Sequence, residues 1–126
     1  MTTDASGGFS FLNIPGSNPT GYTLTEQSQS SAPLSNYGDG QETAGTVNGS
    51  TNGVAGSDTI TGIILNGGDL AIDYLFGELS GGLSGDVYVD NNDDGARDAD
   101  DDPIQGVTVM LSGQTADGQD LSLIHI

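Results

Sequence analysis

Short apolar runs, separated by clusters of Gly, Asn, Asp and Pro, make up most of the chain. Residues 22–26 alternate between apolar and polar positions, which is typical of a half-buried strand. Residues 59–65 are rich in β-branched side chains, and a second run follows the Gly-rich turn at residues 66–68 and occupies residues 70–76. Because such a turn readily adopts positive φ, the two runs predict a β-hairpin. No helical period of three to four persists, so the pattern predicts an all-β fold.

The remaining predicted elements are shorter. Residues 9–12 follow a turn cluster and predict a brief strand. Residues 86–89 and 106–111 predict two more strands, the second with Val107, Val109 and Leu111 on one face. Residues 27–58 are rich in Ser, Gly, Asn and Gln and offer little to bury. This composition indicates a long surface excursion with room for one short strand.

The net charge of the chain limits the kinds of molecule that it is expected to bind. The chain has 18 acidic side chains and one basic side chain, Arg97, for a formal net charge of −17. Neutralising phosphates needs clustered Lys or Arg, so neither nucleic acid nor an anionic membrane surface is an expected partner. No run approaches the ~20 apolar residues that span a bilayer, so membrane insertion is not expected. Such a surface attracts cations, and divalent metal is the natural candidate; adaptation to high salt is the alternative.

The acidic residues concentrate in one loop. Eight of the 18 acids lie between Asp86 and Asp102, and residues 90–101 read DNNDDGARDADD. Calcium takes six to eight oxygens at about 2.3–2.6 Å, and Gly95 permits the sharp bend that such a loop needs. The sequence therefore predicts a Ca²⁺ site, and the alternative is a solvated acidic loop that binds nothing specifically. The predicted ligands are Asp90, Asn92, Asp94, Ala96 (through its backbone carbonyl), Asp98 and Asp101.

The segments on either side of this loop are extended. Residues 87–89 precede it and residues 103–107 follow it, so an EF-hand helix pair is not expected, and the strand that follows also argues against a dockerin loop. Asp101 at the twelfth position is shorter than the usual Glu, which favours a looser site or one that admits magnesium. Arg97 is expected to screen neighbouring carboxylates rather than to take part in chemistry.

Residues 84–98, SGDVYVDNNDDGARD, and residues 103–109, PIQGVTV, closely resemble the opening of an SdrD B-like domain. These domains are related to collagen-binding B-type modules and stand in tandem in bacterial surface and secreted proteins. The resemblance implies an immunoglobulin-like or prealbumin-like β-sandwich. It also implies calcium ligands at the same six positions named above.

The upstream part resembles the closing strands of the same module, at residues 3–11, 22–26, 58–63 and 74–79. The resemblance thus implies that residues 1–79 are the C-terminal two-thirds of one repeat and residues 80–120 the N-terminal third of the next. Incomplete repeats leave sheet edges unpaired. We therefore also consider that residues 84–113 dock onto the first piece as a circularly permuted substitute for its missing strands.

The last six residues, LSLIHI at 121–126, read like one frame of a sequencing-library adapter. This predicts a truncated reading frame whose protein-derived part ends near Asp120; the alternative is a genuine hydrophobic strand. In the first case His125, the single histidine, is not biological. The chain has no Cys and no Lys, so no nucleophile–base pair can then be assembled and an enzyme is not expected.

Together these observations predict a non-enzymatic, calcium-braced stalk or spacer whose partners are neighbouring repeats of the same chain. The resemblance implies an extracellular location, secreted or attached to a cell surface, with signal and anchor outside these residues. The alternative is an adhesive module that binds a host or matrix ligand through a sheet face or through residues 27–58. The tyrosines available to such a surface are Tyr22, Tyr37, Tyr74 and Tyr88.

Overall fold

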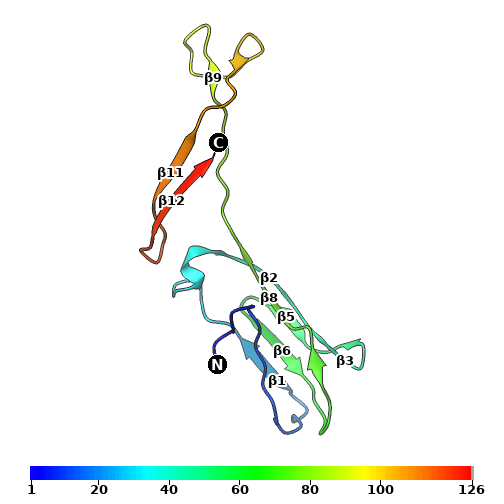
Figure 1. Ribbon diagram of the computed structural model, residues 1–126. Coiled ribbons are helices and arrows are strands. Elements are labelled where there is room, and N and C mark those ends of the chain that lie inside the picture. The colour runs from blue at the N-terminus through cyan, green and yellow to red at the C-terminus, as the bar shows by residue number, and fades with distance from the viewer. Residues whose placement is uncertain (126) are drawn as a thin grey trace. The chain divides into compact units, whose positions relative to one another are not determined.

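The computed structural model describes residues 1–125 and consists of short strands joined by turns (Figure 1). A single 3₁₀ turn, η1 (Leu34–Asn36), accounts for the helical residues among those described. None of the described helical residues forms a segment long and apolar enough to cross a membrane. The all-β prediction is confirmed. The strands are β1 (Tyr22–Thr25), β2 (Gly38–Thr43), β3 (Thr46–Val47), β4 (Ser50–Thr51), β5 (Val54–Gly56), β6 (Thr59–Ile63), β7 (Ala71–Ile72), β8 (Leu75–Leu79), β9 (Tyr88–Val89), β10 (Asp102–Pro103), β11 (Val109–Gln114) and β12 (Asp120–His125).

The chain forms two compact units. The first contains residues 1–28 and 39–78, and the second contains residues 29–38 together with the chain from residue 79 onward. The assignment of these units to repeats of a family, and the docking of residues 84–113 as a substitute for missing strands, stay predictions.

The first unit places three small sheets around one core. Their strand orders are β1-β6-β5, β4-β3-β7 and β2-β8. Ile60, Ile63 and Leu65 are the buried centre of this core. Partly buried side chains from the other sheets pack against them, including Val47 of β3 and Phe76 of β8. The unit is therefore held by a thin apolar layer shared among its sheets, as in a sandwich.

A β-bulge aligns the core residues of β6. In a regular strand, residues three apart face opposite sides of the sheet. Here Tyr22 pairs with Ile63 and Leu24 pairs with Ile60, so β6 carries one residue more than β1 over this stretch. The extra residue is accommodated at Gly62, whose φ is +66°. The bulge allows Ile60 and Ile63 both to be buried in the core.

The predicted hairpin of residues 59–65 with residues 70–76 is wrong. β6 pairs with β1 and β5, whereas β7 pairs with β3 and β8 pairs with β2. The turn itself exists, because the Asp69 N–H donates to the Asn66 carbonyl at 3.1 Å. However, the backbone beyond β6 is already bonded elsewhere: the Leu65 carbonyl accepts the Ser17 N–H at 2.7 Å. The turn therefore carries the chain from one sheet to another.

Two further expectations are corrected. Residues 27–58 contain β2, β3, β4 and β5, more than the one strand expected, because these segments pair through their backbones although few of their side chains are apolar. Residues 9–12 form no strand. The rings of Phe9 and Phe11 instead make an edge contact, with centroids 6.3 Å apart, and Phe9 also contacts Phe76.

The second unit contains two antiparallel pairs, β9 with β10 and β11 with β12. The η1 turn belongs to the same unit, and the Asn36 side-chain oxygen accepts the Asp117 N–H at 3.1 Å. Every residue of β11 is exposed, so the predicted apolar face of Val107, Val109 and Leu111 is not buried. Residues 121–125 of the suspected adapter-derived tail lie in β12, and residue 126 is outside the described residues. That the tail is derived from an adapter stays a prediction.

Replacement of Ile60 by Ala is expected to destabilise the first unit by about 2–5 kcal/mol, because the Ile60 side chain is 0 % exposed and its loss leaves a cavity. Urea unfolding followed by far-UV circular dichroism measures the loss. Val54→Ala on the adjacent strand β5 is the control, because Val54 is 68 % exposed. Equal destabilisation by the two substitutions would contradict the assigned core.

Candidate cation-binding sites

A short ladder closes the predicted calcium loop at its base. Val89 of β9 pairs with Asp102 of β10, and the Ile104 N–H extends the ladder by donating to the Val87 carbonyl at 2.9 Å. The residues directly inside this ladder are Asp90 and Asp101, the first and last predicted ligands. Pairing of the strands therefore brings the two ends of the ligand series to one place.

The first half of the loop is folded around the Asp90 carboxylate. Its Oδ2 accepts the Gly95 N–H at 2.9 Å, and its Oδ1 accepts the Asp94 N–H at 3.2 Å. Gly95 has a φ of +76°, which is the bend that its place in the series predicts. The Asp94 carboxylate accepts the Ala96 N–H at 2.8 Å and the Asn92 side-chain amide at 2.9 Å. These bonds bend residues 90–96 around the carboxylates of Asp90 and Asp94. Four of the predicted ligand positions lie in this half of the loop.

The second half of the loop is organised by Asp101. Its Oδ1 accepts the Asn91 N–H at 3.1 Å and its Oδ2 accepts the Asp98 N–H at 3.0 Å. Asp101 is only 9 % exposed and is the buried charged residue of the described chain. The Asp98 carboxylate accepts the Asp100 N–H at 3.0 Å. Bonds from two backbone N–H groups offset the desolvation of the Asp101 carboxylate.

Sequence reasoning missed Asn91, which is not a ligand position. Its side-chain amide donates to the Asp100 carbonyl at 2.7 Å, and its backbone N–H donates to Asp101. Asn91 thereby ties the start of the loop to its end. The sequence offered one signal for this role. Asn91 directly follows the first predicted ligand, and Asn side chains commonly form hydrogen bonds with nearby backbone groups.

Two groups of the loop region, Asp90 and Tyr88, have shifted pKa values. The Gly95 N–H holds the pKa of Asp90 below its ordinary value. Burial raises the pKa of the Tyr88 phenol, and the charges of four loop carboxylates raise it further. Arg97 forms an ion pair with Asp86 at 3.1 Å, outside the ligand series, and both side chains are exposed. The carboxylates that act on Tyr88 are Asp90, Asp101, Asp94 and Asp98.

The loop does not gather its carboxylates tightly. Asp90 and Asp101 are at least half-buried, whereas Asn92, Asp94, Ala96 and Asp98 are exposed. Among the described residues, the carboxylate trio with potential ligand atoms within 4.8 Å of one another lies in the first unit and not in this loop. The oxygens of the loop carboxylates are turned instead toward backbone N–H groups, as the bonds above show.

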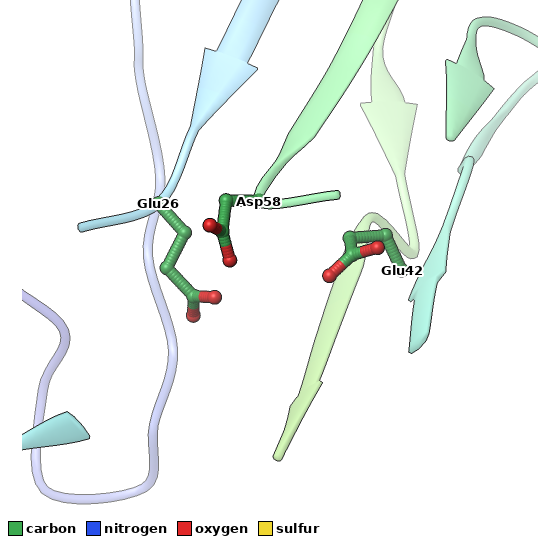
Figure 2. Close-up of side chains that lie close together, drawn as sticks. All are labelled: Glu26, Glu42 and Asp58. Atoms are coloured by element: carbon green, nitrogen blue, oxygen red, sulfur yellow. The ribbon is translucent and has the colours of Figure 1, made fainter. Parts of the chain in front are cut away.

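That trio consists of Glu26, Glu42 and Asp58, which come from separate elements (Figure 2). Glu26 directly follows β1, Glu42 lies in β2, and Asp58 occupies the turn between β5 and β6. The Glu26 N–H donates to the Asp58 carbonyl at 2.9 Å, which sets these two residues side by side. Sequence reasoning missed the trio because its members are far apart along the chain and no spacing rule joins them.

The trio is short of hydrogen-bond donors. Glu26 Oε2, Glu42 Oε1 and Asp58 Oδ1 are each buried and have no hydrogen-bond partner. Desolvation by burial raises the pKa of Glu26 to about 7, with further contributions from a hydrogen bond to Glu78 and from the charges of Glu78, Asp58 and Glu42. The cluster therefore holds a proton at a pH where ordinary carboxyl groups have lost theirs.

This raised pKa predicts a pH dependence of stability. The folded state holds a proton on Glu26 more tightly than the unfolded state, so the stability present below the ordinary pKa of 4.5 is lost as the pH rises to about 7. Carboxyl groups with lowered pKa, such as Asp90, act in the opposite direction and below their ordinary value of 3.8. Urea unfolding in a buffer with EGTA is expected to show lower stability at pH 7.5 than at pH 5.

Glu26→Gln is expected to flatten this dependence between pH 5 and pH 7.5. The matched control is Asp73→Asn, since Asp73 is exposed and its φ of +64° is one that Asn also adopts. A chain whose stability rises over this pH range, or an unaltered slope in Glu26→Gln, would contradict the assignment.

Comparison of the chain with protein-family models, with curated proteins and with solved structures found no match. The resemblance to SdrD B-like domains therefore stays a prediction that depends on residues 84–109 and on the upstream strands.

Proposed function

We propose that the chain is a calcium-braced structural module without catalytic activity, which serves as a stalk or spacer in an extracellular protein that is secreted or attached to a cell surface. The observation that carries this proposal is the closure of residues 90–101 by the β9–β10 ladder, which places Asp90 and the buried Asp101 at the same end of the loop. The ligand series read from the sequence begins and ends at these two residues.

The chemistry of the loop suits a hard divalent cation. Carboxylate, amide and carbonyl oxygens are the donors that Ca²⁺ prefers, and the loop supplies all three kinds. Without a cation, the four loop carboxylates whose charges act on Tyr88 also repel one another. A bound cation removes this repulsion. The residues that would hold it are Asp90, Asn92, Asp94, Ala96, Asp98 and Asp101.

The expected contribution of such an ion to stability is modest. Extracellular modules bind Ca²⁺ with Kd values of about 10⁻⁴–10⁻³ M. At about 1 mM Ca²⁺, mass action then stabilises the folded state by about 0.4–1.4 kcal/mol. Filling a site of this affinity therefore needs about millimolar calcium.

The adhesive alternative has one favourable observation. The hydroxyls of Tyr22 and Tyr74 donate to the carbonyls of Pro15 and Asn52, both at 2.9 Å, so these two rings serve the fold. Tyr37 is 46 % exposed, and no such structural role is assigned to it. Loss of ligand binding in Tyr37→Ala, with the calcium loop intact, would favour adhesion over the spacer function.

Terbium luminescence tests the calcium site directly. Tb³⁺ replaces Ca²⁺ in oxygen sites, and Tyr88 lies near enough to the loop carboxylates to feel their charge. Saturable emission excited through tyrosine is expected, with displacement by millimolar Ca²⁺. Asp90→Ala and Asp94→Ala are each expected to weaken binding at least tenfold, and Tyr88→Phe is expected to dim the emission without a change in affinity.

Asp86→Asn is the matched control, because Asp86 pairs with Arg97 outside the ligand series. If Asp90→Ala and Asp94→Ala bind Tb³⁺ as tightly as Asp86→Asn does, the loop is a solvated acidic segment that binds no ion specifically.

Trypsin provides a second test at the loop itself. Arg97 is the single Lys or Arg of the chain, so trypsin has one cleavage site, and it lies inside residues 90–101. Because a bound ion restrains the loop, cleavage in 2 mM Ca²⁺ is expected to be at least fivefold slower than in EGTA, measured by mass spectrometry of the two fragments. Asp94→Ala is expected to remove the difference. Equal rates in the unaltered chain with and without calcium would count against the proposal.

A further inference from the structure

We propose that Glu26, Glu42 and Asp58 form a second divalent-cation site, of the calcium class, in the first unit. This inference goes beyond the proposed function, since it concerns other residues in the other unit and does not depend on the family resemblance.

The geometry fits an ion of this size. The potential ligand oxygens of the three residues lie within 4.8 Å of one another. Two oxygens that both contact one Ca²⁺ at about 2.6 Å can be at most about 5.2 Å apart. Figure 2 shows the three carboxylates facing a common space from separate elements. An ion there would contact all three with small side-chain adjustments, and water and second carboxylate oxygens would complete its coordination.

Burial of unpartnered oxygens is the independent observation. One oxygen each of Glu26, Glu42 and Asp58 has less than 1 Å² of accessible surface and no hydrogen-bond partner. A buried charged oxygen without a donor is strongly unfavourable, so such groups take up a proton, an ion pair or a metal.

The chain has no basic side chain to offer these oxygens. Lysine is absent, and the one arginine, Arg97, is paired with Asp86 in the other unit. Protons and cations therefore remain as the compensating charge. A divalent cation can supply this charge to oxygens of all three residues at once.

The site joins separate sheets. Glu26 and Asp58 flank strands of the β1-β6-β5 sheet, whereas Glu42 lies in β2, which pairs with β8. The Ser57 hydroxyl also donates to Asp39 of β2 at 3.2 Å, which links the same two regions beside the cluster. A cation held by the trio would therefore link the two sheets a second time, in addition to the apolar core that they share.

Calorimetric titration with CaCl₂ at pH 8 tests the site in the full chain. The doubly substituted chain Asp90→Ala/Asp94→Ala disables the loop, and we expect it to keep one saturable Ca²⁺ site. Further substitution with Glu42→Gln and Asp58→Asn is expected to abolish that site, and further substitution with Asp73→Asn is expected to leave it unchanged. Because protons compete for the same oxygens, the affinity of the remaining site is expected to fall at least tenfold at pH 5.5.

Urea unfolding of the loop-disabled chain supplies an independent readout. Calcium is expected to raise the urea midpoint of unfolding when the trio is intact. The single substitution Glu26→Gln is expected to remove this shift. It provides a test of the site even if the chain with Glu42→Gln and Asp58→Asn does not fold. Absence of Ca²⁺ binding to the loop-disabled chain at 5 mM, or equal binding after Glu42→Gln/Asp58→Asn and after Asp73→Asn, would overturn the proposal. The loop site fails by a different result: the unaltered chain and the loop-disabled chain would then bind calcium identically.

Discussion

Repulsion among carboxylates is the constraint under which this chain folds. Eighteen acidic side chains share one arginine, so ion pairs between side chains can compensate only a small part of the charge. Elsewhere the protein uses its own backbone: Asp90 and Asp101 accept N–H groups within their loop, and Asp4 does the same near the N-terminus. Where backbone donors are lacking, as around Glu26, the carboxylate keeps a proton or requires a metal. The two candidate sites thus differ in how carboxylate charge is compensated: by backbone N–H groups in the loop, and by protons or cations in the trio.

The apolar core gives this arrangement little margin. Ile60, Ile63 and Leu65 are its buried residues, and many other large apolar side chains are exposed. Small β-structures depend on backbone pairing and on any additional cross-link they can acquire. In such a protein, a contribution of about one kcal/mol from a bound ion is a substantial share of the total stability. An ion bound at either candidate site would therefore be coupled to folding more tightly than in a protein with a large core.

The features that local spacing determines were predictable from the sequence. The all-β class followed from period-two runs and frequent turns, and the bend at Gly95 followed from its place in the ligand series. The partners of β6 were not predictable, because Ser17 satisfies the backbone beyond that strand from 48 positions away. The Glu26 trio was invisible for the same reason: only tertiary pairing brings β1, β2 and the β5–β6 turn together. Sequence patterns thus point to candidate sites built from contiguous residues and miss candidates assembled from distant segments.

The bulge at Gly62 imposes a rule on how this protein can change. Ile60 and Ile63 are three positions apart, and both face the core only because the bulge takes up one residue between them. A β-branched residue in place of Gly62 would strain the bulge, since Gly62 has a φ of +66°. Deletion of Gly62 would instead leave the two isoleucines two positions apart, on one face of a regular strand and opposite the same partners in β1. Composition and length of β6 are therefore linked: glycine is needed at this position only while the extra residue is present.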